Sequence, residues 1–465
     1  MRRRDVLHGG AGLLAIAALR PLSARALADD AVTVTLRSVV VPGGLAFNGS
    51  VPGPLLRVAH GQRVRVRYIS DVDVPTSIHW HGMLLPNAMD GVAWVTQPPV
   101  RRREEFVYEF APGPPGTRWY HDHAFHFASV RGLFGMFVVE DPKNEPAHRD
   151  FALVFHDVAD WRSLQAAVRG LSTAPMTDPM GSSESMKPSE RRMGDEVAYV
   201  AHRINGASYP QGKKLAVRVG ERVRLRILNA SPTQTRYVRF AGHEMIVTHA
   251  DGNPLVRPVA IDALRVAAGE RYDALVDFRR PGAFLLQGIS RDPLEAQQAV
   301  VFYSDGMENA LPQAESPMLD GLRVFSYELA GGGAPAIETP QTVPTYDLTL
   351  GGGGWGNPRW TIDDRIWPHT RKLLVRRGER VAVRFRNVTG MDHPMHLHGH
   401  VFALSEVNGV QLARPLAKDG ALVDANGGTA TWSFSANSPP GRWMLHCHND
   451  VHMAGGMMTE LIYDD

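Results

Sequence analysis

The heptapeptide GQRVRVR at residues 61–67 recurs as GERVRLR at residues 220–226 and as GERVAVR at residues 378–384. The copies begin 159 and 158 residues apart, from 61 to 220 and from 220 to 378. Each copy starts with a turn-forming glycine and continues with alternating apolar and polar side chains, which is typical of a strand with one buried face. The repeat therefore predicts three similar β domains.

A second repeated element combines a proline-glycine turn with an apolar strand. It reads PPGTRWYH at residues 114–121, RPGAFLL at 280–286 and PPGRWMLH at 439–446. Only the outer copies run into histidines, so we expect the middle domain to be structural. Short strands between 45 glycines and 33 prolines indicate an all-β chain of Greek-key sandwiches. We predict domains at 31–145, 150–310 and 320–465, with linkers at 172–196 and 330–340.

Four short stretches are rich in histidine, and the last of them contains the only cysteine of the chain. They read HWH at residues 79–81, HDH at 121–123, HPMHLH at 393–398 and HCHNDVH at 446–452. In an extended strand, His-x-His places both imidazoles on one face, about 6 to 7 Å apart along the backbone. Imidazole and thiolate ligands suit copper, whereas a site for a hard cation would be built from carboxylates. The pattern therefore predicts several neighbouring copper sites.

These stretches, in this order, resemble the multicopper oxidase family, and the resemblance covers nearly the whole chain after its first 30 residues. It implies three cupredoxin-type domains and four copper ions, one of type 1, one of type 2 and two of type 3. The implied ligands are His393, Cys447, His452 and Met457 for type 1, His79 and His396 for type 2, and His81, His121, His123, His398, His446 and His448 for type 3. Met458 is the neighbouring alternative to Met457 as the axial ligand.

The resemblance also implies the reaction, in which four one-electron oxidations of a donor are coupled to reduction of O₂ to water. We expect electrons to enter through a partly exposed edge of His393 or His452. They would leave through Cys447 and the backbone to its two neighbouring histidines. Because the ligands come from the first and last domains, we expect the type 2 and type 3 cluster at the interface of these domains. A thioether at Met457 favours a low type 1 potential and easily oxidised donors.

Two carboxylates are candidate catalytic residues. Asp90 matches an acidic residue that in the family lies near the cluster and helps to move protons, although an aspartate before a glycine is also an ordinary turn residue. Asp450 stands three residues after Cys447, where some laccases carry an aspartate. Met453 occupies a position where many bacterial members have a proton-relaying glutamate, which leaves proton delivery from that side open.

The N-terminus predicts export. Residues 1–28 contain the Arg3-Arg4 pair, an apolar stretch at 9–19 and the sequence ALA at 26–28, which indicates a cleaved twin-arginine signal and a periplasmic or secreted protein. The apolar stretch is too short for an ordinary span, and an uncleaved anchoring helix is the alternative. Loss of five arginines and one aspartate lowers the formal charge from +2 to −2, and nothing indicates a nucleic-acid partner. A lone cysteine in an oxidising compartment cannot form an intrachain disulfide, and metal ligation would protect it.

The donor has no local signature in the sequence. Phenols and other small aromatic donors are the first expectation, and Cu(I), oxidised in a periplasmic copper-tolerance role, is the second. A non-catalytic scaffold of the same fold is a third alternative, which the complete ligand set argues against. A copper nitrite reductase fits a threefold repeat poorly. The segment 172–196 bears on this choice because it carries Met176, Met180, Met186 and Met193. It is similar to the methionine-rich segments of copper-tolerance oxidases, or it is a linker whose methionines are incidental.

If these four thioethers collect Cu(I), replacing all four with serine should raise the apparent KM for Cu(I) and spare phenol oxidation, because thioethers are soft ligands. Steady-state oxygen consumption with each donor measures this selectivity. Equal loss with both donors would indicate a structural segment, and no loss with either would indicate incidental methionines.

Overall fold

The structure is a computed structural model, and it describes residues 31–124, 127–141, 143, 147–160, 162–163, 197–289, 298–312, 319–332, 343–353 and 358–464. The predicted signal at 1–28 and the methionine-containing segment 172–196 lie outside these residues. The described chain belongs to one compact unit, Ala31–Asp465. Within it, no helix is long and apolar enough to cross a membrane.

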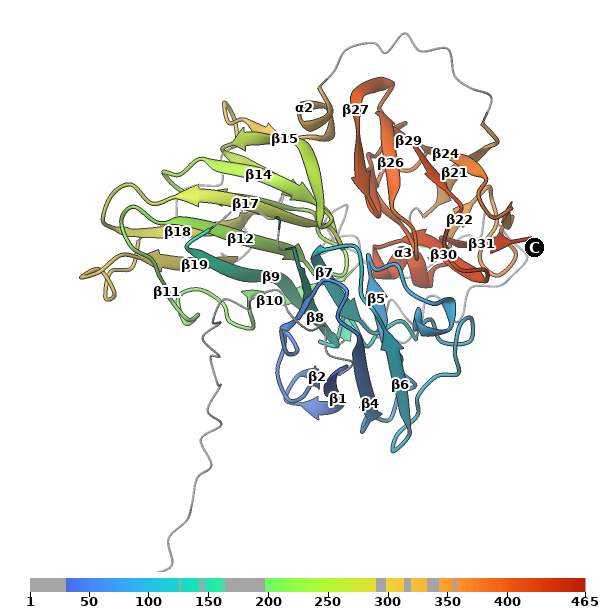
Figure 1. Cartoon of the computed structure of the whole chain (residues 1–465), viewed down its shortest axis with the longest axis horizontal. Helices are drawn as coiled ribbons and strands as arrows, with labels where there is room; N and C mark the ends of the chain where they lie inside the picture. Colours follow the sequence, from blue (N-terminus) through green and yellow to red (C-terminus); the bar gives the residue numbers. More distant parts are fainter. Residues whose placement is uncertain are drawn as a thin grey trace, which may run out of the picture. The chain divides into compact units, whose positions relative to one another are not determined.

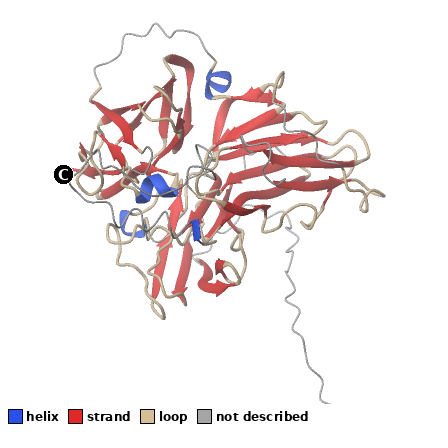
Figure 2. Ribbon diagram, turned by 180° about the vertical axis from the view of Figure 1, so that it is seen from behind, coloured by secondary structure: helices blue, strands red, loops and turns tan. Residues whose placement is uncertain are grey.

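Six β-sheets form three sandwiches, which confirms the predicted all-β fold of three cupredoxin-like domains (Figure 1, Figure 2). The first sandwich has one sheet in the order β2 (Gly44–Phe47), β1 (Val32–Val41), β4 (Val64–Ser70) and β6 (Glu105–Phe110). Its other sheet runs in the order β3 (Leu56–Ala59), β8 (Phe134–Glu140), β7 (Gly116–His121) and β5 (His79–His81).

The middle sandwich is the largest by strand number among the described residues. One sheet has the order β10 (Tyr199–Ile204), β9 (Arg149–Ala159), β12 (Arg222–Asn229), β17 (Arg271–Asp277), β14 (Met245–Ala250) and β15 (Asn253–Ile261). The other has the order β11 (Leu215–Ala216), β19 (Gln298–Tyr303), β18 (Ala283–Ile289), β13 (Arg236–Phe240), β16 (Ala263–Val266) and β20 (Val324–Phe325). Because β20 pairs with β16, this sandwich uses residues beyond 310. The domain limits stay a prediction.

The third sandwich carries the C-terminal strands. One sheet has the order β22 (Trp360–Ile362), β21 (Thr345–Gly352), β24 (Arg380–Asn387), β29 (Thr429–Ser435), β26 (Phe402–Val407) and β27 (Val410–Lys418). The other has the order β23 (Leu373–Val375), β31 (Met458–Tyr463), β30 (Arg442–Cys447), β25 (His393–Leu397) and β28 (Gly420–Val423). Short helices among the described residues include η1 (Asn87–Met89), α2 (Tyr327–Gly331) and α3 (Asp450–Ala454). The predicted linker 330–340 therefore begins inside α2.

The heptapeptide repeat falls on equivalent strands of the three sandwiches. Its copies contribute to β4, β12 and β24, and each of these pairs in parallel with the first strand of its own sandwich, β1, β9 or β21. Burial alternates along β4 and β24, as the apolar and polar pattern predicts. The sequence repeat thus corresponds to a repeat of topology.

Strand β12 departs from the expected alternation, because nearly all of its side chains are buried. The first sandwich covers the face that should be exposed: Arg226 Nη1 donates to Thr117 Oγ1 of β7 at 3.0 Å. The same guanidinium pairs with Asp273 at 3.0 Å, also through Nη1. A charged face can be buried here because its cation meets an anion and a hydroxyl.

Strand pairing brings the histidine stretches together. In the first sandwich, β5 pairs with β7 so that His79 lies opposite His121. In the third, β25 pairs with β30 so that His396 lies opposite His446 and Met395 opposite Cys447. Helix α3 begins shortly after the end of β30. The side chain of its N-cap residue, Asn449, accepts hydrogen bonds from the backbone N–H groups of Val451 and His452. This turn places His452 back beside Cys447.

The first and middle sandwiches meet where two glycines approach each other. Gly116, at the start of β7, has φ +129°, and a Cβ there would lie 2.0 Å from the carbonyl oxygen of Gly252. We expect Gly116→Ala to destabilise the fold by about 1–3 kcal/mol beyond backbone strain, because the overlap cannot be relieved by side-chain motion. Denaturant unfolding of the purified protein measures this.

Gly43→Ala is the matched control, because Gly43 also has positive φ (+82°) and a Cβ there would meet nothing within 4 Å. It should show only the strain of that backbone conformation, about 1–2 kcal/mol. Equal destabilisation by both substitutions would argue against close packing at this junction.

Candidate metal centres

Eight histidines lie buried together where the first and third sandwiches meet. Four come from β5 and from the end of β7 with the residues that follow it, and four from β25, β30 and the residues that follow them. Their possible ligand atoms form three groups in which all atoms lie within 4.8 Å of one another: His79, His81 and His396; His81, His121 and His448; and His123, His398 and His446. The expected meeting of the outer histidine stretches is therefore present in the fold.

The ring nitrogens of these histidines fit a set of metal ions. Within the described part of the chain, the buried ring nitrogens without a hydrogen-bond partner include Nε2 of His79, Nε2 of His121, Nε2 of His396, Nδ1 of His81 and both nitrogens of His448. A buried polar atom normally has a partner. Several such atoms converging on one place indicate positions that metal ions satisfy.

The opposite ring nitrogens are held by oxygen atoms. The Nδ1–H of His79 donates to the backbone oxygen of Asp90 at 2.8 Å, and that of His398 donates to Oδ2 of the same residue at 2.9 Å. On the other side, His396 Nδ1 donates to the backbone oxygen of Asp419 at 2.7 Å. The Nε2–H of His81 faces Asp419 Oδ1 at 3.2 Å. Such bonds fix the tautomer and orientation of a metal-binding histidine.

Burial favours the neutral form of several of these imidazoles. Desolvation, with smaller contributions from neighbouring histidines, lowers the pKa of His81, His121 and His396 well below the usual value. Desolvation also lowers the pKa of His446, to about 4. Neutral imidazole is the form that binds metal ions, so the group is ready for ligation at neutral pH.

A separate group contains the cysteine. Cys447 Sγ lies 3.7 Å from Nδ1 of His393 and 3.5 Å from Nδ1 of His452, and the two Nδ1 atoms are 2.9 Å apart. The Nε2 atom of His393 lies 2.8 Å from the hydroxyl of Thr389. One sulfur and two nitrogens converging in this way match the trigonal ligand set of an electron-transfer copper.

Two methionines follow this group, and they pack in different places. Met457 is fully buried, and its backbone oxygen accepts the Cys447 N–H at 3.0 Å. Met458 instead packs with Val92, Met444 and Met453. The packing favours Met457 as the thioether beside the cysteine.

The expectation of a partly exposed histidine edge is wrong. His393 and His452 are both 0% exposed. The indole of Trp360, from β22, covers them: its ring centre lies 3.8 Å from that of His452 and 5.4 Å from that of His393. Trp360 itself is 4% exposed. This cover could not be predicted from the sequence, because Trp360 is distant from every histidine stretch.

The two candidate carboxylates occupy different surroundings. Asp90 is buried and contacts His79 and His398 directly, as described above. Asp450 begins α3, and its Oδ2 accepts a hydrogen bond from Ser129 Oγ at 3.0 Å. Burial raises the pKa of Asp450 to about 7. Burial also raises the pKa of Asp122 to about 7, and the nearby charge of Asp450 adds to the effect.

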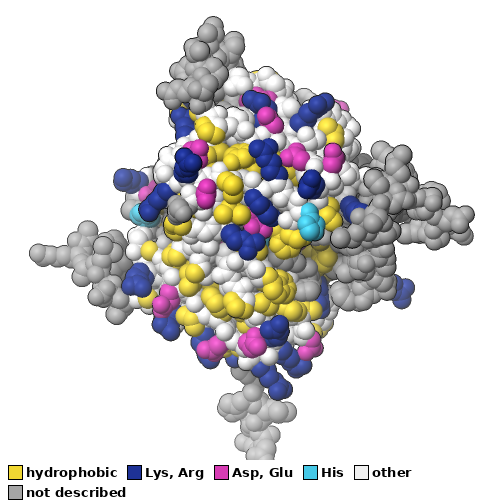
Figure 3. All heavy atoms as spheres, turned by 90° about the vertical axis from the view of Figure 1, so that its right-hand side faces the viewer, with side chains coloured by type: hydrophobic (Ala, Val, Ile, Leu, Met, Phe, Trp, Pro, Cys, Tyr) yellow, Lys and Arg dark blue, Asp and Glu magenta, His cyan; other side chains and the backbone are white. Residues whose placement is uncertain are grey.

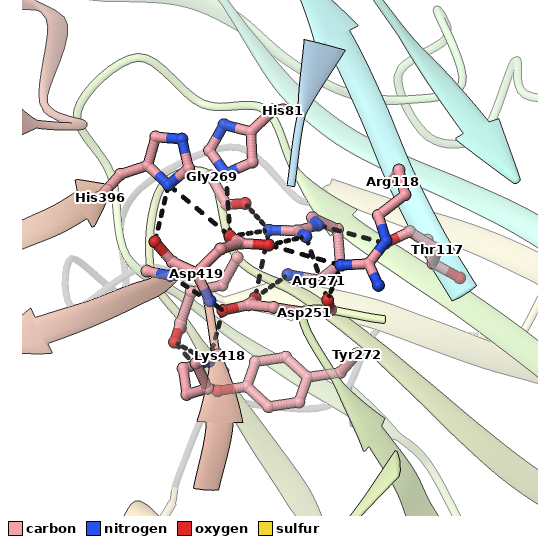
Figure 4. A network of polar contacts seen from close by, with 12 residues as sticks. His81, Thr117, Arg118, Asp251, Gly269, Arg271, Tyr272, His396, Lys418 and Asp419 are labelled. Atoms are coloured by element: carbon pink, nitrogen blue, oxygen red, sulfur yellow. Dashed lines mark hydrogen bonds and ion pairs between the residues drawn. The ribbon is translucent and has the colours of Figure 1, made fainter. Parts of the chain in front are cut away.

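Sequence reasoning missed a charged network beneath the histidines (Figure 4). It contains the cations Arg118, Arg271 and Lys418 and the anions Asp251, Glu270 and Asp419, all buried. Figure 4 shows Asp419 directly below His81 and His396. A pattern search could not find this network, because its members come from three sandwiches and none lies in a histidine motif.

Comparison with known proteins identifies the family. Three family models, each described as multicopper oxidase, match residues 31–144, 178–302 and 338–465. Multicopper oxidase MmcO of Mycobacterium tuberculosis is 32% identical over 99% of this chain and 92% of its own length. Laccase-1 of Fomitopsis schrenkii is 27% identical, over 90% and 82%, and a copper resistance protein A homolog of Pseudomonas syringae pv. tomato is 26% identical, over 90% and 88%.

Solved structures share the fold. A laccase from Botrytis aclada superposes with a TM-score of 0.77 at 21% identity, covering 93% of this chain and 87% of its own. Fet3p, a multicopper oxidase that functions in iron import, superposes with a TM-score of 0.76 at 18% identity, covering 94% and 91%.

This chain belongs to the multicopper oxidase family. It is therefore an oxidase that uses oxygen as acceptor and the type 1, type 2 and type 3 copper ions of that family as cofactors. These findings confirm the predicted family, enzyme class and cofactor.

Proposed function

We propose that the chain oxidises small phenols or related aromatic donors one electron at a time, and that the copper ligands are those the sequence predicts. The observation that carries this proposal is the grouping of ring nitrogens around two places, joined by the tripeptide His446-Cys447-His448. In this assignment Cys447, His393, His452 and Met457 hold type 1 copper. His79 and His396 hold type 2, and the type 3 ligands are His81, His121 and His448 for one ion and His123, His398 and His446 for the other.

Bound copper supplies one-electron redox chemistry at both places, so that electrons from four donor molecules can be stored and delivered to O₂. The protein supplies the connection between them. Cys447 lies in the trigonal group, while its neighbours His446 and His448 each belong to one of the two groups assigned to type 3. The covalent path from sulfur to either imidazole therefore crosses a single peptide bond.

Asp90 and Asp450 are the proposed proton-handling residues. Asp90 supports this role through its hydrogen bonds to two ligand histidines from different sandwiches. Asp450 supports this role by its position. It is the first residue of α3, and along the chain it lies between the proposed ligands His448 and His452. Met453 packs against apolar neighbours and offers no ionisable group.

The burial of His452 under Trp360 affects which donors the protein can oxidise. Because both type 1 histidines are buried and Trp360 is only 4% exposed, a donor meets the protein at surface atoms outside Trp360, and its electron crosses the remaining distance through the indole. On the face drawn in Figure 3, acidic and basic side chains are interspersed, so local contacts rather than a field of one sign would select a donor there.

Cu(I) is the second candidate donor. Relatives named copper resistance protein A support it, at 24–26% identity over about nine-tenths of this chain. The four methionines of 172–196 support it by composition. Export by the twin-arginine machinery to the periplasm, or beyond the cell, is proposed from residues 1–28 alone.

We expect His79→Ala or His396→Ala to keep the blue thiolate absorption and to abolish reduction of O₂ to water, because each removes a type 2 ligand and leaves the cysteine group whole. Absorption spectra and oxygen consumption with a phenol, on protein of measured copper content, separate the two effects. Normal oxygen reduction by a fully loaded variant would show that the ligands are misassigned.

We expect Trp360→Leu to slow anaerobic bleaching of the blue absorption by a phenol and to leave the absorption itself intact, because the indole bridges donor and His452. Trp360→Phe should retain more of the rate, since it keeps an aromatic ring. Trp432→Phe is the control, because that indole stacks on Phe402 in the core of the third sandwich.

Faster bleaching in Trp360→Leu would mean that the indole is a barrier and would contradict the proposed entry point. The same measurement with Cu(I) compares the two donors. Oxidation of Cu(I) without any oxidation of phenols would transfer the function to the second candidate.

A further inference from the structure

The middle sandwich contributes no ligand to the proposed copper sites, yet one of its side chains reaches their edge. Arg271 begins β17, is fully buried, and forms two hydrogen bonds to the carboxylate of Asp419: Nη1 to Oδ1 at 2.7 Å and Nη2 to Oδ2 at 2.5 Å. This bidentate geometry fixes the plane of the carboxylate as well as its position.

Asp419 lies between β27 and β28 of the third sandwich and contacts two ligand histidines. Its Oδ1 receives the Nε2–H of His81, and its backbone oxygen receives the Nδ1–H of His396. The first contact leaves Nδ1 of His81 facing the group it shares with His121 and His448. A rotated carboxylate would lose this contact and with it the constraint on the His81 ring.

Arg271 is held firmly enough to act as a positioning group. Its Nε donates to the backbone oxygen of Thr117 at 3.2 Å, and its Nη1 donates to that of Gly269 at 3.2 Å. It also pairs with Asp251 at 3.3 Å. These contacts come from the first and middle sandwiches, so the guanidinium is fixed independently of the third.

The strand that carries His81 leaves no room for another arrangement. Gly82 follows His81 with φ +78°, and a Cβ there would lie 2.4 Å from both Arg271 Nη2 and Asp419 Oδ2. The ion pair therefore runs directly against the backbone beside the ligand. Nearby charges balance, since Lys418 pairs with Asp251 at 2.9 Å.

We propose that Arg271 is a positioning residue for the copper cluster, which it affects by holding the Asp419 carboxylate against His81 and so fixing the nitrogen that faces the metal. The middle sandwich then shapes the cluster without supplying a ligand. This inference rests on the ligand assignment proposed above.

The chain contains a matched control. Arg236, also buried in the middle sandwich, pairs with Asp157 at 2.5 Å, and Asp157 in turn lies 2.5 Å from Nδ1 of His202. In both places a buried arginine pairs with an aspartate that contacts a histidine. His202, however, belongs to none of the groups of possible metal ligands found among the described residues. Substitution of each arginine in turn therefore distinguishes an effect on the cluster from a general effect on the stability of the fold.

The test compares Arg271→Leu and Arg271→Lys with Arg236→Leu and Arg236→Lys in the copper-loaded full chain. Copper content, blue absorption, electron paramagnetic resonance and thermal unfolding are measured on each. Arg271→Leu should keep the blue absorption and weaken copper binding at the cluster by about 10- to 100-fold, the usual effect of losing an outer partner of a ligand. Arg271→Lys should bind copper at the cluster with an affinity between those of wild type and Arg271→Leu, because it keeps the positive charge and loses the bidentate contact with the carboxylate.

Arg236→Leu should lose thermal stability and keep the wild-type copper spectra. A wild-type cluster in Arg271→Leu, or equal loss of the cluster in both leucine variants, would overturn the inference. If Arg271→Leu does not fold, Asp419→Asn keeps the volume and should change the cluster signal in the same way, and an unchanged signal would overturn the inference as well. Wild-type protein that binds no coupled copper pair would instead overturn the proposed function.

Discussion

The structure depends on a constraint on the clustered imidazoles: a ring nitrogen faces the cluster, and in most of these rings the other nitrogen meets an oxygen atom. Six of the eight clustered histidines show the second contact, to oxygens of Asp90, Asp122, Asp419 and Cys447. These oxygens hold the rings in orientation. The second contacts, more than the histidines alone, decide where metal ions can bind.

The three sandwiches contribute different residues to the site. The outer two supply the histidines, and their strand pairings bring His79 opposite His121 and His396 opposite His446. The middle sandwich supplies Arg271 and Asp251, which lie under Asp419. A domain without ligands can therefore still be required at the site, because a buried carboxylate needs a fixed cation beside it.

The sequence predicted the fold through its repeats, since a turn glycine followed by alternating side chains marks the same strand three times. It also identified the histidine stretches, because local spacing and strand geometry place such residues on one face. It could not predict the contacts of Asp419, Arg271 and Trp360, which join segments far apart in the chain. The same limit explains the wrong expectation for His452, whose exposure depends on a strand about ninety residues earlier in the sequence, Trp360–Ile362.

We propose that two separate places, one around Cys447 and one among eight histidines, hold the copper ions of this oxidase. Anomalous diffraction at the copper edge from crystals of the loaded protein tests it most directly. We expect one copper among His393, Cys447 and His452, and three more among the histidines of the three groups. Strong copper peaks at other residues, or a cluster without the copper shared by His79 and His396, would contradict it.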